Sequence, residues 1–235
     1  MKRKLYELLI PKPIRENIYQ ANVREFNEAE ISRLLSIEES LPNAELSSIY
    51  IANLSVLTNR NAFLDVMKKD SFVAEIGVRD GIFTEKILSI TKPQKLHLID
   101  TWPDEKYQEG LVERQNRIIE NKFREEIASE QVAIHRGEPL VELKGFKEDY
   151  LDWVFIDNGH SSNYIATLLE LCRTKVKSGG IITGCNYVTG YFPTRERYGV
   201  IEAVNTFCKK NEWEMVYLTN ESHRNLSYAI QKMAL

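Results

Sequence analysis

From residue 71 onward, short apolar runs alternate with segments whose apolar residues recur at helical spacing. The runs predict β-strands because they are brief and bounded by polar or glycine residues. They occupy residues 72–77, 95–100, 131–137, 151–157, 179–184, 213–219 and 226–232. Alternation of strand and helix predicts an α/β fold, a doubly wound and mostly parallel sheet with helices on both faces. Only "NESHRN" separates the last two runs, which predicts a hairpin and one antiparallel strand.

The first 70 residues show a different pattern, in which helical spacing continues without strand-like runs. It predicts helices between residue 22 and about residue 67, interrupted at Pro42. Asn43 is a candidate N-cap for the second helix, since its side chain can accept from backbone N–H groups. We therefore expect a helical N-terminal cap or lead-in at residues 1–70 and the main domain at residues 71–235.

Composition narrows the class of protein. The chain has 235 residues, a net charge of −3 and a pI near 5.9, so no basic excess points to nucleic acid, which is not expected as a partner. Cys172, Cys185 and Cys208 form no CxxC pair, which predicts reduced thiols in a cytoplasm rather than a disulfide or zinc framework. No run approaches the roughly 18 apolar residues of a transmembrane segment, so none is expected.

The stretch "FVAEIGVRDG" carries the first candidate chemistry. It is a strand with a carboxylate, Glu75, followed by a turn with Gly77 and Gly81. In doubly wound sheets, ligands bind beyond the carboxyl ends of the strands, where the strand order reverses. Asp100 ends the next predicted strand, where a carboxylate can accept from ribose hydroxyls. Glu75 would repel a pyrophosphate but attract an ammonium or sulfonium, so the pattern predicts a cationic, adenosine-containing cofactor.

These motifs resemble those of class I S-adenosylmethionine-dependent methyltransferases. "AEIGVRDG" resembles the first motif of the family, "LHLIDTW" the second, "LDWVFIDNGH" the fourth-strand motif and "KVKSGGIITG" the turn into the fifth strand. The likeness is strongest to a bacterial subgroup with "IDxDH" and "GHDY" motifs, which read "IDNGH" and "GCNY" here. The resemblance implies a Rossmann-like sheet of seven strands in the order 3-2-1-4-5-7-6, with strand 7 antiparallel.

The resemblance also assigns cofactor-binding residues. Gly77 and Gly81 should line the methionine part of S-adenosylmethionine, with Glu75 near its amino group and Asp100 on its ribose. The remaining residues implied to contact the cofactor, or its product S-adenosylhomocysteine, are Thr101, Trp102, Gly137, Glu138 and Asp157.

On the acceptor side, the resemblance places Asp157 at the end of the fourth strand, facing the methyl donor and the acceptor. His160 follows it and is the candidate general base for a hydroxyl acceptor, because imidazole titrates near physiological pH. The alternative is a histidine that packs at the start of a helix.

Some relatives hold a divalent metal with acids after the fourth and fifth strands. The corresponding residues here are Asp157, Cys185 and Asn186. Because a thiol is a poor ligand for magnesium, we expect no metal site and no metal dependence.

The segment "CNYVTGYFPTRERYG" is predicted to be a loop. Its aromatic residues, with Arg195 and Arg197, could form a substrate wall that meets an anionic acceptor. The alternative is a solvated surface loop.

The leading hypothesis is a methyltransferase acting on oxygen of a small molecule, such as a sugar, a glycan precursor or a secondary metabolite, by analogy alone. Two copies could pair through the N-terminal helices. One alternative is a non-catalytic cofactor-binding or scaffold protein, suggested by the "CNY" change. Another is a nucleotide-dependent oxidoreductase, which the absence of G-x-G-x-x-G disfavours.

Overall fold

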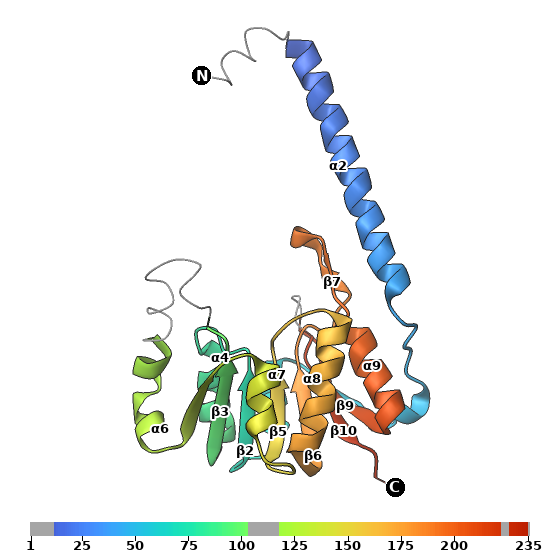
Figure 1. Cartoon of the computed structure of the whole chain (residues 1–235). Coiled ribbons are helices and arrows are strands. Elements are labelled where there is room, and N and C mark those ends of the chain that lie inside the picture. Colours follow the sequence, from blue (N-terminus) through green and yellow to red (C-terminus); the bar gives the residue numbers. More distant parts are fainter. Residues whose placement is uncertain (1–11, 103–117, 222–225, 235) are drawn as a thin grey trace.

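The computed structural model describes residues 12–102, 118–221 and 226–234. Its centre is an eight-stranded sheet in the order β1-β9-β10-β6-β5-β2-β3-β4 (Figure 1). The strands are β1 (Ser55–Leu57), β2 (Phe72–Ile76), β3 (Lys95–Asp100), β4 (Val132–Arg136), β5 (Leu151–Ile156), β6 (Val176–Gly184), β9 (Trp213–Thr219) and β10 (Tyr228–Lys232). Apart from β10, which runs antiparallel to both β6 and β9, all neighbouring strands are parallel.

This topology confirms the predicted fold class. From β4 to β9 the seven strands follow the order implied by the resemblance, and the antiparallel strand is the predicted one. β1 is an addition, an edge strand parallel to β9 that the sequence did not suggest. The chain leaves β2 toward β3 and β4, then returns on the other side through β5. The strand order therefore reverses between β2 and β5, which is where such sheets bind ligands.

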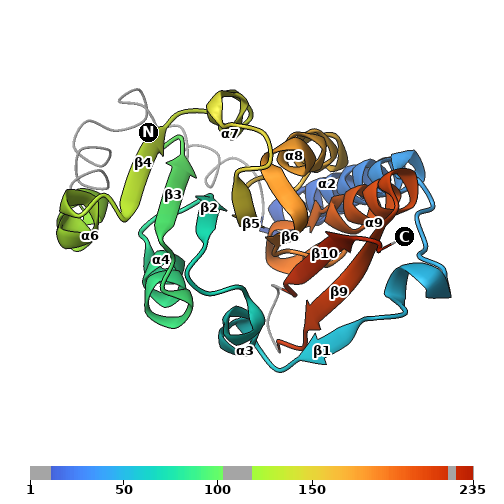
Figure 2. The ribbon, with the colours of Figure 1, turned by 90° about the horizontal axis from the view of Figure 1, so that it is seen from below.

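Helices cover both faces of the sheet (Figure 2). They are α3 (Arg60–Val66), α4 (Ile82–Lys86) with the π-helical η2 (Ile87–Thr91), α6 (Arg124–Ala128), α7 (Pro139–Glu142), α8 (Ser162–Lys175) and α9 (Val200–Asn211), with 3₁₀ turns η1 (Ser48–Ile51), η4 (Leu143–Gly145) and η5 (Phe192–Thr194). α8 and α9 bury their apolar faces in one core cluster, and α3 and η2 contribute to a second cluster on the other face. All six residues of β5 are buried, as expected of a central strand covered on both faces.

The N-terminal region differs from its prediction after residue 40. The helix α2 (Lys12–Ser40) is continuous, but the second predicted helix is wrong. Its place is taken by η1, β1 and α3. Asn43 does not cap a helix; Asn59 caps α3 instead, accepting from the backbone N–H groups of Asn61 and Ala62 at 2.9 and 3.0 Å. A local capping side chain thus divides a segment whose apolar spacing alone looked helical.

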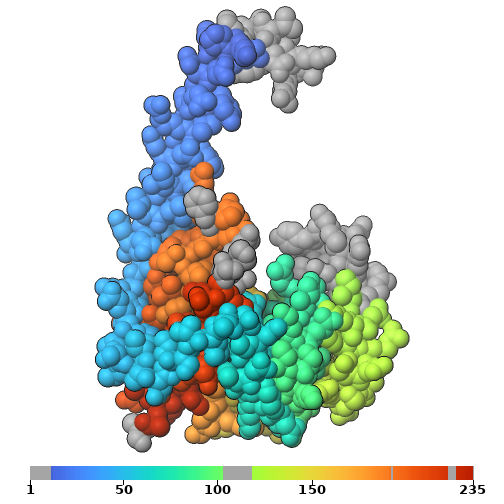
Figure 3. Space-filling model, turned by 180° about the vertical axis from the view of Figure 1, so that it is seen from behind, coloured from blue at the N-terminus to red at the C-terminus, as the bar shows by residue number. Residues whose placement is uncertain are grey.

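α2 stands away from the sheet and has no buried residue (Figures 1 and 3). Its contacts are with a small hairpin formed by β7 (Gly190–Tyr191) and β8 (Glu196–Arg197). A groove of about 790 Å³ lies between the two; its lining includes Arg195 and Arg197 but none of the predicted catalytic or cofactor-binding residues. No helix within the described residues is both long enough and apolar enough to cross a lipid bilayer.

Candidate active site

The predicted site lies at the carboxyl edge of the sheet, beginning with the turn after β2. Gly77 and Gly81 have φ of 87° and 72°, a left-handed region that favours glycine. A Cβ on Gly77 would lie 2.1 Å from the carbonyl oxygen of Asp157, so its lack of a side chain lets the turn touch the end of β5. A Cβ on Gly81, the N-cap of α4, would lie 2.7 Å from the ring of Phe123. The two glycines are therefore needed for local packing as well as for any ligand.

Asp100 braces this turn from the end of β3. Its Oδ2 accepts from the backbone N–H groups of Val78 and Arg79 at 2.8 and 2.9 Å. Its Oδ1 accepts from the N–H of Trp102 at 3.1 Å. A carboxylate can accept about four hydrogen bonds. Three of these come from backbone N–H groups, so roughly one remains for a ribose hydroxyl. The structure thus places Asp100 beside the turn as expected and adds a structural role that the sequence did not reveal.

Glu75 is 1% exposed and faces α4, where Thr84 donates to its Oε2 at 2.6 Å. Burial raises the pKa of Glu75 to about 8; the Thr84 hydrogen bond and the positive charge of Arg60 oppose this rise, and the nearby carboxylates of Asp157 and Asp100 add to it. A buried cation beside Glu75 would reverse the effect, because an opposite charge favours the ionised form. Three carboxylates from neighbouring strand ends thus create a site suited to a positive ligand.

Thr101 and Trp102 follow Asp100 but lie differently. Thr101 is exposed, whereas the Trp102 ring is 3% exposed within a core cluster. The indole Nε1 of Trp102 donates to the carbonyl oxygen of Arg79 at 3.1 Å, and the Arg136 guanidinium lies 5.4 Å from the ring centroid. Trp102 therefore stabilises the turn after β2 from the side of the core.

Gly137 and Glu138 follow β4 at the same edge. The N–H of Gly137 donates to the carbonyl oxygen of Asp100 at 3.1 Å, which continues the pairing of β3 with β4. Glu138 is exposed and precedes α7, and its Oε1 accepts from the Tyr164 hydroxyl at 3.1 Å. That carboxylate connects the end of β4, two strands from β2, to α8.

His160 and Asn186, which follow β5 and β6, meet across the edge. The Nδ2 of Asn186 lies 3.1 Å from the Nε2 of His160, and the imidazole stacks on Tyr198 at 4.0 Å between ring centroids. An amide NH₂ only donates, so Nε2 accepts and the imidazole proton lies on Nδ1. For His160 to take a proton at Nε2, the acceptor hydroxyl must replace Asn186 as its hydrogen-bond donor.

Cys185 is buried between these residues and the core. Burial raises the pKa of its thiol well above the usual value, the carboxylate of Asp157 adds to the rise, and Arg60 opposes it. All three cysteines of the chain are free and buried. Among the described residues, no group of three or more His, Cys, Asp or Glu side chains is arranged to hold a metal ion.

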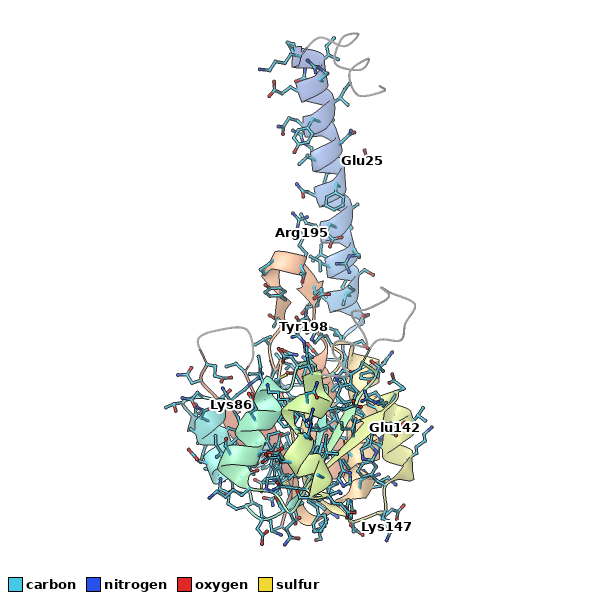
Figure 4. The ribbon with its side chains drawn as sticks, turned by 90° about the vertical axis from the view of Figure 1, so that its left-hand side faces the viewer. Glu25, Lys86, Glu142, Lys147, Arg195 and Tyr198 are labelled. Carbon is cyan, nitrogen blue, oxygen red and sulfur yellow. The ribbon has the colours of Figure 1, made fainter. Side chains whose placement is uncertain are left out.

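The segment after Asn186 is not a simple loop, because it forms the β7–β8 hairpin. Arg195 lies beside α2, where its Nη1 donates to Asn27 at 3.1 Å (Figure 4). Arg197 pairs with Glu38 of α2 and, at 2.6 Å, with Glu202 of α9. Tyr198 lies at the foot of the hairpin, nearer the sheet (Figure 4). The structure therefore uses both arginines to join the hairpin to helices, whereas the Tyr198 ring and the backbone N–H of Gly199 contact His160.

The sequence analysis missed Arg60. The guanidinium lies 4.0 Å from Asp157 and 3.6 Å from Glu221, which follows β9. Its position at this edge depends on β1 and on the Asn59 cap, both hidden in the segment taken as one helix. The signal that could have revealed it is Thr58–Asn59, a polar capping pair in front of Arg60.

Comparison with known proteins agrees with this geometry. A family model described as a methyltransferase domain matches residues 74–187. A presumed rRNA methylase from Clostridium thermocellum has 14% identity and a TM-score of 0.55 over 74% of this chain and 94% of its own. The B. subtilis m1A22 tRNA methyltransferase TrmK has 12% identity and a TM-score of 0.51, over 75% of this chain and 67% of its own. Aeropyrum pernix fibrillarin, solved with S-adenosylmethionine, has 10% identity and a TM-score of 0.50, over 69% and 67%. No curated protein sequence matches the chain.

The sheet and its edge define a Rossmann-like, ligand-binding α/β protein. Together with the methyltransferase domain matched at residues 74–187, they support a class I S-adenosylmethionine-dependent methyltransferase. The prediction that nucleic acid is not a partner was wrong, because proteins with this fold include rRNA and tRNA methylases. Net charge averages over the whole chain, whereas nucleic-acid binding depends on the local distribution of charge around a site.

Proposed function

We propose that the protein transfers a methyl group from S-adenosylmethionine to a hydroxyl oxygen of an acceptor bound beside His160. The observation that carries this proposal is the electrostatic convergence of Glu75, Asp100 and Asp157 at the β2–β5 crevice. Such a site favours a sulfonium and disfavours a pyrophosphate. A small hydroxylated molecule, such as a sugar, a glycan precursor or a secondary metabolite, is the acceptor class we favour, by analogy with the subgroup that the motifs resemble.

The residues divide the work along the edge. The Gly77–Gly81 turn would hold the methionine part of the cofactor, with Glu75 beneath it. Asp100 would offer its remaining acceptor position to the ribose. The adenosine would lie beside Thr101, Gly137 and Glu138. Trp102 would act on it indirectly, by supporting the turn after β2. The bound cofactor would supply an electrophilic methyl group.

On the acceptor side, His160 would accept the hydroxyl proton at Nε2. Tyr198 holds the imidazole plane by stacking, and Asn186 holds Nε2 toward the edge until an acceptor replaces it. Asp157 would face both reactants from the end of β5. Alignment of the two reactants supplies much of the rate enhancement in such displacements.

Calorimetry and turnover test the proposal in two stages. Calorimetry with S-adenosylmethionine, S-adenosylhomocysteine and NAD should show binding of the first two and not of NAD. Formation of S-adenosylhomocysteine should then be measured with a panel of hydroxylated small molecules and with RNA. Preference for NAD would support an oxidoreductase. Binding of S-adenosylmethionine without turnover on either arm of the panel would support a non-catalytic protein.

A further inference from the structure

Arg60 is held rigidly at the carboxyl edge of the sheet. It is the first residue of α3, and only Thr58 and Asn59 separate it from the parallel strand β1. Its backbone N–H donates to Glu221 Oε1 at 2.8 Å, and its Nε donates to Ser227 Oγ at 3.1 Å. Glu221 follows β9 and Ser227 precedes β10, so residues flanking two further strands hold Arg60, one at its backbone and one at its side chain.

The guanidinium lies against two aromatic rings, with its carbon 5.5 Å from the centroid of Phe83 and 5.6 Å from that of Phe155. Aromatic rings stabilise the positive charge of the guanidinium. They do not supply strong acceptors for its N–H groups. The Nη2 atom is buried and has no hydrogen-bond partner within the described part of the chain. Buried polar groups almost always have partners, and a donor fixed in position without one points to a missing ligand oxygen.

The neighbours of Arg60 indicate which reactant supplies that oxygen. They are Asp157 after β5, Cys185 after β6, Glu221 after β9 and Ser227 before β10. These four polar neighbours lie on the side of the β2–β5 crevice away from Asp100 and β3, while Phe83 of α4, which follows β2, packs against the guanidinium from the other side. The adenosine half of the cofactor is assigned to the β3–β4 side, so Arg60 belongs to the acceptor half.

We propose that Arg60 binds the acceptor, with Nη2 donating to the oxygen that receives the methyl group. This inference rests on the proposed function. In the transfer, the acceptor O–H proton passes to His160, the O–CH₃ bond forms, and the S–CH₃ electron pair remains on sulfur. Negative charge builds on the acceptor oxygen as its proton leaves, and the fixed guanidinium stabilises that charge. The acceptor class is therefore a hydroxyl compound whose oxygen can carry negative charge.

The test compares Arg60→Met and Arg60→Lys with the matched control Arg173→Met, which alters an exposed arginine on α8. With the acceptor found in the panel, Arg60→Met should lower the transfer rate about 10²–10³-fold, the usual loss for one donor to a developing oxyanion. Affinity for S-adenosylhomocysteine should stay unchanged, and Arg173→Met should behave as the wild type. Arg60→Lys keeps the charge without Nη2 and should recover part of the rate. It also keeps the test valid if thermal unfolding shows that Arg60→Met does not fold.

A second measurement does not need the acceptor. Sodium acetate is titrated into the S-adenosylhomocysteine complex against sodium chloride at equal ionic strength, with arginine side-chain ¹⁵N resonances as the readout. The Arg60 resonances should shift in the wild type in the millimolar range, and the same shift should be absent from Arg60→Met. No shift at Arg60 would overturn the inference.

The other outcomes are distinguishable. Wild-type transfer rates in Arg60→Met would overturn the role of Arg60 and leave the proposed function standing. An equal loss of rate and of S-adenosylhomocysteine affinity would overturn it in favour of a contact with the cofactor carboxylate. Failure of the wild type to bind S-adenosylhomocysteine would reject the proposed function itself, whatever the acetate titration shows.

Discussion

The two halves of the carboxyl edge use polar side chains in opposite ways. At the ends of β2 and β3, Asp100 accepts hydrogen bonds from three backbone N–H groups, two in the turn after β2 and one two residues along the chain. The buried carboxyl of Glu75 accepts a hydrogen bond from Thr84. At the ends of β5, β6 and β9, side chains meet other side chains. His160 contacts Asn186, and Arg60 contacts Asp157 and Glu221.

The difference teaches how the site is assembled. The cofactor half is built from backbone amides that the fold supplies, so it is shaped before a ligand arrives. The acceptor half retains exchangeable or missing partners, the Nε2 of His160 and the Nη2 of Arg60. Polar groups that are already satisfied act as scaffold, whereas those with a partner still to gain can act on a substrate.

The largest effect should come from His160→Ala in the acceptor half. Loss of a general base should slow methyl transfer about 10²–10⁴-fold. S-adenosylhomocysteine affinity, measured by calorimetry, should remain near that of the wild type because the imidazole contacts the acceptor side alone. A parallel loss of affinity would break the division into halves, and a small change in rate would assign His160 a packing role against Tyr198.

Gly77→Ala should give the next largest effect, on folding. A residue with a side chain at left-handed φ costs roughly 1–2 kcal/mol, and the clash of its Cβ with the Asp157 carbonyl adds about 1–3 kcal/mol. Urea unfolding should therefore show a loss of about 2–5 kcal/mol.

Gly179→Ala is the matched control, because Gly179 has φ of 74° and nothing within 4 Å of its Cβ position. It should lose only the conformational part, roughly 1–2 kcal/mol. Equal losses in the two variants would mean that the turn after β2 can move away from β5, against the tight contact in the structure.

Asp100→Ala should combine a loss of stability with a loss of affinity. Leaving buried N–H groups of Val78, Arg79 and Trp102 without an acceptor should destabilise the fold by about 1–3 kcal/mol. S-adenosylhomocysteine binding should weaken by about 1.5–3 kcal/mol, through the ribose contact and the loosened turn. Urea unfolding and calorimetry measure the two losses separately. Weaker binding at full stability would make Asp100 a ligand group first and contradict its scaffold role.

The same contrast explains what could be predicted from the sequence. The strands of the main sheet from β2 onward and the glycine turn could be predicted from local patterns of apolar runs, glycines and acids at strand ends, whereas the β7–β8 hairpin could not. The acceptor half depends on pairs distant in the chain, such as Arg60 with Glu221 at a sequence separation of 161. No local pattern predicts such a contact. Asp100 lies at the end of β3, as its predicted strand requires, but its three hydrogen bonds from backbone N–H groups could not be predicted because they depend on the conformation of the turn.

Glu75→Gln should change the pH dependence of stability, which tests whether the cofactor half is closed without ligand; over any single pH unit this effect is smaller than those above. The pKa of Glu75 is about 8 in the folded chain, against an ordinary value of 4.5. Between these two values the unfolded chain has lost the proton and the folded chain retains it. The folded state therefore binds more protons, and the free energy of unfolding must fall as pH rises through this window.

Relative to Glu75→Gln, which cannot ionise and can still accept from Thr84, the wild type should lose about 1.4 kcal/mol per pH unit between pH 4.5 and 8. Above this window the difference should level off, since both states are then ionised. Urea unfolding at a series of pH values measures it. Parallel curves would mean that Glu75 is already charged in the folded chain. A positive group or water would then contact the Glu75 carboxylate in the absence of cofactor. The cofactor half would not be closed without ligand.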